Sequence, residues 1–133
     1  GPRRAACRSG REQAYRSAGT PHAAGRVDGE ATLALPSLSI VIPTYNGRAH
    51  LERCLPSVCA HAPARTQLLV IDDCSTDDTA TWISQHFPNV EFHRLEKNLG
   101  FCGAANFGLA QAHGDVVELL NNDTEVLPGW ADA

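Results

Sequence analysis

The sequence is without several features that would assign it to a large class of proteins. It contains no Met, not even at position 1, and none of its apolar runs approaches the ~20 residues that a membrane-spanning helix needs. The Arg-rich start, residues 1–11, is followed by no apolar signal-peptide core. We therefore expect no transmembrane segment in this sequence. The missing Met, and an end at Ala133 just after a turn, favour a piece of a longer protein.

Cysteine spacing argues against a zinc site and against a disulfide framework. The five cysteines form no CxxC pair and stand mostly within apolar stretches. Cys54 and Cys59 would point to different faces of a helix, and no second pair follows them. We expect reduced, buried thiols in a cytoplasmic protein. Peripheral attachment to the inner face of a membrane is left open.

Charge and composition divide the chain in two. Residues 1–36 hold six Arg against three acidic residues and are rich in Ala, Gly and Ser, although the whole chain has a net charge of −4. Such a segment cannot bury enough apolar surface to offset its ordering entropy. We predict a flexible leader or linker over 1–36 and one domain over 37–133. The arginines could contact nucleic acid, but a solvated tail is favoured, so no nucleic-acid partner is expected.

The domain alternates short apolar runs with helical spacing. The predicted strands are residues 38–43, 67–72, 90–95 and 115–120. Residues 90–95 are a shorter, alternating run, and the other three are nearly continuous apolar runs, which are typical of a parallel sheet that is covered on both faces. The expected helix stripes are Leu51, Leu55, Val58 and Cys59, then Ala80, Ile83 and Phe87, then Phe101, Ala105, Gly108, Leu109 and Ala112. Residues 75–78 would cap the second helix and Gly114 would end the third. The order βαβαβαβ predicts a doubly wound α/β fold.

Polar or glycine-rich sequence follows each predicted strand. These loops are residues 43–47, 72–75, 98–103 and 121–123. In open parallel sheets the carboxyl ends of the strands are where ligands bind, so four such loops on one edge predict a site. Residues 43–47 could also be a simple turn, and Asp72 and Asp73 could be helix caps, although residues 75–78 already supply caps. The glycines at 100, 103 and 108 do not fit GxGxxG, which argues against a dinucleotide site.

Four motifs in order carry a resemblance to a known family. The stretches LSIVIPTYNGRAHLERCLPSV, LLVIDDCSTDDT, NLGFCGAANFGLAQAHGDVVELLNND and PGW resemble the N-terminal, nucleotide-sugar-binding half of family 2 glycosyltransferases. The resemblance covers residues 37–130 and looks most like the rhamnosyltransferase-type branch. It implies the N-terminal half of a GT-A (Rossmann-like) three-layer sandwich, truncated at its C-terminus. It also implies sugar transfer with inversion from a nucleotide-diphosphate sugar to an acceptor.

The resemblance also assigns roles to the loops. Asp123 would be the last acid of a DxD-like motif and would ligate Mg²⁺ or Mn²⁺, with Asn122 standing where many members have an acid. Tyr45 would frame the base, Asp73 would accept a hydrogen bond from its ring, and Asp72 would support Asp73. Gly100 would let the backbone approach the ligand closely. Together, the residues expected to bind the donor are Pro43, Thr44, Tyr45, Asn46, Asp72, Asp73, Asn98, Gly100, Asn106 and Asn122.

The family's remaining parts are not expected in this chain. The donor would be a dTDP- or UDP-sugar and the acceptor a saccharide or a lipid-linked molecule. In the family the catalytic base belongs to the second half, and no candidate for it follows Trp130 except the terminal Asp132. We therefore expect a chain that binds a donor and does not turn over.

Two other classes of protein share features with this sequence: phosphorelay receivers and nucleotide-binding modules. A phosphorelay receiver would also carry an acidic pair after an apolar strand, but residues 38–46 would be an extra unit ahead of it. Its phosphoacceptor Asp should also follow an apolar run directly, whereas two Asn precede Asp123. A nucleotide-binding module without transferase activity stays open.

Overall fold

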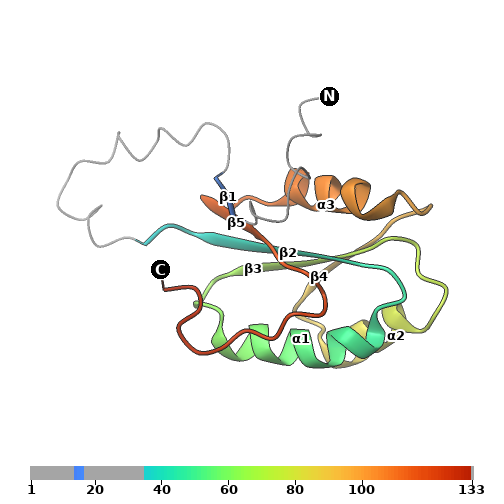
Figure 1. Cartoon of the computed structure of the whole chain (residues 1–133), viewed down its shortest axis with the longest axis horizontal. Helices are drawn as coiled ribbons and strands as arrows, with labels where there is room; N and C mark the ends of the chain where they lie inside the picture. The colour runs from blue at the N-terminus through green and yellow to red at the C-terminus, as the bar shows by residue number, and fades with distance from the viewer. Residues whose placement is uncertain (1–13, 17–34, 133) are drawn as a thin grey trace.

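The computed structural model describes residues 14–16 and 35–132, which form one sheet with helices on both faces (Figure 1). In chain order the elements are β1 (Ala14–Arg16), β2 (Leu38–Thr44), α1 (Arg48–His61), β3 (Gln67–Asp72), α2 (Thr79–His86), β4 (Glu91–Arg94), α3 (Gly100–Gln111) and β5 (Val116–Leu119). Helices α1 and α2 lie on one side of the sheet and α3 lies on the other (Figure 1). The three-layer α/β architecture is as predicted.

The strand order places a change of direction next to β2. The sheet runs β1-β5-β2-β3-β4, and every pair is parallel except β1 with β5. From β2 the chain moves outward through β3 to β4, and it then returns through α3 to place β5 on the other side of β2. The loops after β2 and β5 therefore diverge at a topological switch point, which is where such sheets bind ligands.

All four predicted strands are confirmed, and one strand was not foreseen. Strands β2 and β3 are buried along most of their length because both of their faces are covered. The additional strand β1 pairs antiparallel with β5 over three residues, with Ala14 opposite Glu118. It lies within the segment that was predicted to be a flexible leader. For residues 1–13 and 17–34 that prediction falls outside the described part of the chain.

Two apolar cores hold the layers together. One lies between the sheet and α1 and α2, and the other lies between the sheet and α3. Helix α1 buries Leu51, Leu55 and Val58, as predicted, and also Cys54. Cys59 was predicted to be buried, but it is exposed.

The helix α3 packs on the sheet through small residues. Its buried positions are Ala104, Ala105 and Gly108. A Cβ on Gly108 would stand 2.3 Å from Val41 Cγ1 and 2.9 Å from Ile71 Cγ1, so only glycine lets α3 approach β2 and β3 this closely. Phe101 was expected in this stripe but is about half exposed, at 51%.

The helix ends differ in part from the sequence expectation. Asp77 accepts a hydrogen bond from the Thr79 N–H at 3.0 Å, but Asp78, the N-cap of α2, makes no side-chain cap hydrogen bond, so the predicted cap is wrong at that position. Helix α3 ends at Gln111 with an extended C-cap, so Gly114 does not terminate it. Instead, Gly114 packs against β2 and donates its N–H to Ser39 Oγ at 2.8 Å.

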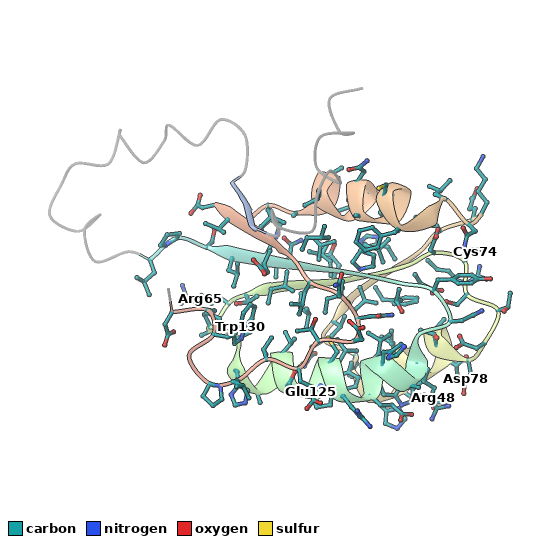
Figure 2. All side chains as sticks on the ribbon, in the orientation of Figure 1. Arg48, Arg65, Cys74, Asp78, Glu125 and Trp130 are labelled. Carbon is teal, nitrogen blue, oxygen red and sulfur yellow. The ribbon has the colours of Figure 1, made fainter. Side chains whose placement is uncertain are left out.

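Helices α1 and α2 are joined at their exposed N-terminal ends. The Arg48 side chain forms ion pairs with Asp78, which precedes α2, and with Glu52 at 3.1 Å (Figure 2). Its guanidinium also lies 5.7 Å from the centre of the Trp82 ring. These exposed contacts are of the kind that contribute little to stability individually, so the layer rests mainly on its apolar core.

The cysteines differ from the expectation of buried, reduced thiols. Cys54, Cys59 and Cys74 are free, as expected, but only Cys54 of these three is buried. Cys102 is disulfide-bonded, so the prediction of a reduced thiol is wrong there. Among the described residues, no helix combines the length and the apolar character needed to cross a membrane.

Candidate functional site

A cavity of about 260 Å³ opens at the carboxyl edge of the sheet, at the switch point between β2 and β5. Its walls come from the ends of three strands and from the first turn of α3. The lining residues are Pro43, Thr44, Tyr45, Asp73, Phe101, Ala104, Asn121, Asn122 and Asp123. The structure thus brings together six of the eleven residues that the sequence assigned to donor and metal.

The end of β2 is tied to both neighbouring loops. The Thr44 carbonyl accepts a hydrogen bond from the Asp73 N–H at 2.8 Å, and Thr44 Oγ1 accepts one from Asn122 Nδ2 at 2.9 Å. A Cβ on Gly47 would stand 2.3 Å from Thr44 Oγ1 and 2.4 Å from Asn122 Nδ2, so this approach requires glycine. Tyr45 comes next and is 49% exposed, which leaves its ring accessible at the cavity.

Asp73 is a buried carboxylate that faces the start of α3. Its Oδ1 accepts the Leu99 N–H at 2.7 Å and its Oδ2 accepts the Gly100 N–H at 2.9 Å. These bonds satisfy two backbone donors near the helix N-terminus, where such groups have no partner within the helix. Each carboxylate oxygen keeps a second lone pair. Asp73 is therefore able to accept a further hydrogen bond from a ligand in the cavity.

Asp72 does not line the cavity, although it is adjacent to Asp73. It is fully buried, and its carboxylate accepts hydrogen bonds from the hydroxyl and the N–H of Ser75. Arg94 Nε lies 3.6 Å from Asp72 Oδ2. Burial raises the pKa of Asp72, whereas the two Ser75 hydrogen bonds and the Arg94 charge lower it. The carboxylate thus fixes the loop after β3 rather than facing the cavity.

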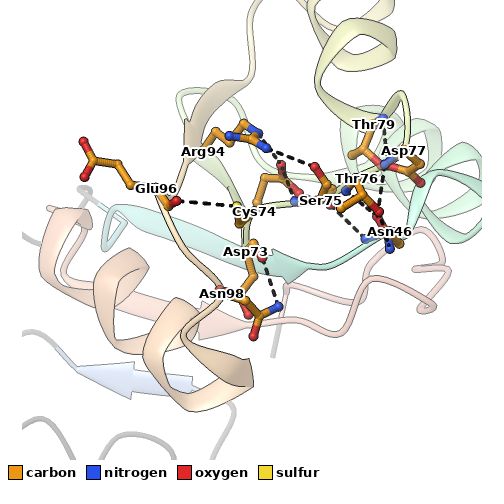
Figure 3. A network of polar contacts seen from close by, with 11 residues as sticks. Asn46, Asp73, Cys74, Ser75, Thr76, Asp77, Thr79, Arg94, Glu96 and Asn98 are labelled. Atoms are coloured by element: carbon orange, nitrogen blue, oxygen red, sulfur yellow. Dashed lines mark hydrogen bonds and ion pairs between the residues drawn. The ribbon is translucent and has the colours of Figure 1, made fainter.

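Four other predicted donor-binding residues also lie outside the cavity lining. Asn46 binds the loop after β3 through its amide (Figure 3). Asn98 donates to the Asp73 carbonyl at 3.1 Å, and Gly100 adopts a φ of +81° with open space where a side chain would stand. Asn106 is on α3, and its buried Oδ1 has no hydrogen-bond partner in the described part of the chain. Their assignment to a donor stays a prediction.

The loop after β5 supplies the third wall. Asn121, Asn122 and Asp123 all line the cavity, and Asp123 is exposed. Nearby, the Cys54 Sγ lies 3.9 Å from the Asn121 carbonyl. Burial, and then the negative charge of Asp123, raise the pKa of Cys54 to about 12. The thiol is therefore protonated at neutral pH.

The donor set at this loop fits a hard cation only if a ligand completes the shell. Across residues 14–16 and 35–132, no group of three or more His, Cys, Asp or Glu side chains is placed to hold a metal. Asp123 would be the carboxylate contact, with water and ligand oxygens in the other positions. Mg²⁺ keeps several waters and is commonly held by one or two carboxylates together with phosphate oxygens, so the arrangement suits it.

Three lining residues were not among the eleven assigned: Asn121, which belongs to one of the predicted polar loops, and Phe101 and Ala104. Phe101 follows Gly100 at the start of α3, and its half-exposed ring adds an apolar surface to the cavity. The signal in the sequence was its place directly after the loop that leaves β4, because a residue in the first turn of α3 stands at the same edge as the strand ends. Helical spacing of apolar residues does not distinguish a residue at the cavity from a residue in the core.

A mainly parallel sheet covered on both faces, with an acidic, partly aromatic cavity at its switch point, defines a doubly wound α/β domain whose cavity lies at the edge where such sheets bind ligands. Within that class, the family model described as Glycosyl transferase family 2 matches residues 39–132. The chain therefore belongs to glycosyl transferase family 2.

Relatives of known name agree with this membership. The chain is 31% identical over 104 residues to the GalNAc(5)-diNAcBac-PP-undecaprenol beta-1,3-glucosyltransferase of Campylobacter jejuni, covering 71% of this chain and 32% of that protein. It is 26% identical to S. aureus TarS 1-349, solved in complex with UDP-GlcNAc, with a TM-score of 0.61, covering 70% of this chain and 28% of that one. The mannosyltransferase PcManGT from Pyrobaculum calidifontis, in complex with GDP-Man and Mn²⁺, is 25% identical with a TM-score of 0.59. The match covers 69% of this chain and 29% of that one. The fold is GT-A-like.

The chain spans about a third of the length of the curated relatives that it matches.

The strand order separates this chain from a phosphorelay receiver. In the receiver-like order 2-1-3-4-5, the strand with the acidic pair is next to the third strand counted from it. Here β3 carries the pair, and β2 lies between it and β5.

Proposed function

We propose that this chain is the donor-binding part of a glycosyltransferase that moves a sugar from a nucleotide-diphosphate sugar to an acceptor with inversion. One observation carries the proposal. Tyr45, Asp73 and Asp123, from three different strand ends, line a single cavity at the switch point. An aromatic face, a hydrogen-bond acceptor and a metal-binding carboxylate are what a base and a diphosphate require.

The proposed roles follow from chemistry and position. The face of Tyr45 would stack on the base, and Asp73 would accept a hydrogen bond from its ring through a free lone pair. Asp123 would hold Mg²⁺ or Mn²⁺ against the diphosphate, and a bound cation would neutralise the charge that develops on the leaving group. Asn122 is held by Thr44 at 2.9 Å and would keep the Asp123 loop in place.

The donor class is proposed as a dTDP- or UDP-sugar and the acceptor as a saccharide or a lipid-linked molecule. The UDP-GlcNAc complex of TarS supports a pyrimidine nucleotide, and the Mn²⁺ complex of PcManGT supports a divalent cation. The rhamnosyltransferase-like branch is supported only by the motif forms in residues 98–126. A cytoplasmic location is part of the same proposal.

The catalytic base is proposed to lie outside this cavity. Asp73 and Asp123 are the acidic residues among its lining residues, and both are assigned to the donor. The relatives' greater length supports a separate segment that supplies the base and the acceptor site. We also propose that the donor-binding part begins at residue 37. This chain alone would bind the donor without turning it over.

The test is a calorimetric titration of the parent chain, Asp123→Asn and Asp73→Asn with UDP and dTDP, with and without Mn²⁺. Asp123→Asn keeps the shape of the side chain and should raise the Kd at least tenfold with Mn²⁺, roughly 1.4 kcal/mol, and change little without it. Asp73→Asn should weaken binding in both conditions, because its proposed partner is the base.

Glu125→Gln is the matched control. It removes an exposed carboxylate two residues from Asp123 that does not line the cavity. It should bind as the parent chain does. If Asp123→Asn also binds as the parent does when Mn²⁺ is present, the metal assignment is wrong.

A further inference from the structure

A polar network outside the cavity ties the loops after β2, β3 and β4 together (Figure 3). Its members are Asn46, Asp72, Ser75, Thr76, Asp77 and Arg94. None of them lines the cavity, yet two of them stand next to residues that do. Asn46 follows Tyr45, and Asp72 precedes Asp73. The network is therefore placed to set the distance between those two walls.

Asn46 is the link from the β2 side. Its N–H donates to Ser75 Oγ at 2.8 Å, and its Oδ1 accepts the N–H groups of Thr76 and Asp77 at 2.8 and 3.2 Å. Both lone pairs of the amide oxygen are thus in use. The backbone of Asn46 has a φ of +48°, a left-handed conformation that Asn tolerates better than most residues.

The loop that is hydrogen-bonded to Asn46, residues 75–77, is itself held to the sheet. The Ser75 hydroxyl donates to the fully buried carboxylate of Asp72. Arg94 on β4 lies 3.6 Å from that carboxylate and donates to the Ser75 carbonyl at 3.1 Å. Because Asp72 is the last residue of β3, the partners of Asn46 are fixed to two strands. Asn46 consequently holds the β2 loop against a rigid support.

We propose that Asn46 is a positioning residue: it does not contact the donor but holds Tyr45 at a fixed separation from Asp73, so that the base fits between them. This inference rests on the proposed function, in which Tyr45 and Asp73 meet the base. It replaces the direct contact to the donor that the sequence suggested for Asn46, since the amide oxygen accepts two N–H groups of the loop and the amide nitrogen donates to Thr76 Oγ1 at 3.2 Å.

The positioning role requires that residue 46 adopt a left-handed backbone conformation and that its side chain accept hydrogen bonds. Substitutions of Asn46 test these two requirements separately. Asn46→Gly tolerates the left-handed backbone but removes the acceptor for Thr76 and Asp77. Asn46→Asp keeps an acceptor oxygen and a side chain that tolerates this conformation. The first variant should lose the positioning, and the second should retain most of it.

The experiment compares two probes, UDP with Mn²⁺ and inorganic pyrophosphate with Mn²⁺, by calorimetry on the full chain. Asn46→Gly should weaken UDP about tenfold, the scale of one lost base–aromatic stack, and should leave pyrophosphate binding unchanged. Asn46→Asp should restore UDP binding. In the Tyr45→Ala background, Asn46→Gly should add little, because the contact that it positions is already gone.

The outcomes are distinct. Unchanged UDP binding by Asn46→Gly, or an equal loss for UDP and pyrophosphate, would overturn the positioning role and leave the proposed function intact. A parent chain that binds neither probe would overturn both. Thermal melts establish that each variant folds, and Asn46→Ser, whose shorter side chain does not span to Asp77, replaces Asn46→Gly if that variant does not fold.

Discussion

At the scale of single residues, the two adjacent acids at the end of β3, Asp72 and Asp73, have different surroundings. Asp73 lines the cavity and holds two backbone N–H groups, whereas Asp72 is turned to Ser75 and Arg94. Successive side chains of a strand point to opposite faces, so neighbouring residues at its end do not share one site. A motif of two carboxylates therefore supplies one candidate ligand contact and one structural anchor.

The Cys54 thiol should react far more slowly than the other free thiols. Burial and the nearby Asp123 charge raise its pKa to about 12, and the thiolate is the reactive form, so almost none is present at pH 8. Burial also raises the pKa of Cys59, but that side chain is exposed. Iodoacetamide labelling of the folded chain at pH 8, followed by peptide mass spectrometry, should modify Cys59 well before Cys54.

In urea the same labelling should proceed at similar rates at Cys54 and Cys59, because unfolding removes the burial. Equal rates in the folded chain would contradict the environment described for Cys54.

At the scale of the elements, α3 depends on Gly108 for its approach to β2 and β3. Alanine is the better helix former by about 1 kcal/mol. However, its Cβ would stand 2.3 Å from Val41 Cγ1, and overpacking of a core costs about 1–3 kcal/mol. The net effect of Gly108→Ala should be to lower the free energy of unfolding by up to about 2 kcal/mol, measured by urea denaturation.

Ala110→Gly is the control for helix propensity, because Ala110 is exposed on the same helix. It should cost about 1 kcal/mol through propensity alone. A Gly108→Ala chain more stable than the parent would mean that the α3 contact with the sheet is looser than described.

The elements themselves could be predicted because their signals are local. Three apolar runs predicted β2, β3 and β5, a shorter alternating run predicted β4, and small-residue spacing predicted α3. Strand β1 had no such signal, since Ala14–Arg16 has neither an apolar run nor alternation and is defined only by its pairing with β5. The polar loops were correctly placed on one edge, but which side chains face the cavity depends on contacts between loops. The Asn46 amide, for example, is committed to residues 76 and 77, thirty residues along the chain.

At the scale of the whole molecule, nucleotide and metal should stabilise the fold together. A ligand at a hundred times its Kd adds about 2.7 kcal/mol, and in a domain of this size each kcal/mol raises the Tm by roughly 4–8 °C. UDP with Mn²⁺ should therefore raise the Tm by about 10 °C or more. Mn²⁺ alone should do little, because Asp123 offers it one carboxylate.

Thermal melts of the parent chain and of Asp123→Asn, with each ligand alone and with both, give the comparison. The variant should show only the shift that UDP produces by itself. If Mn²⁺ alone shifts the parent as far as the pair does, the cation binds elsewhere.

The position of the cavity also has a consequence for the order of assembly. Its walls include Thr44 and Asn122, whose side chains are joined across 78 positions of the sequence. Parallel pairing of β2 with β5 must close that whole span, and contacts of this length form late and slowly. As the chain leaves the ribosome, β2 and β3 can pair first, but the cavity is incomplete until β5 has docked. The onset of nucleotide binding during refolding would therefore time the docking of the last strand.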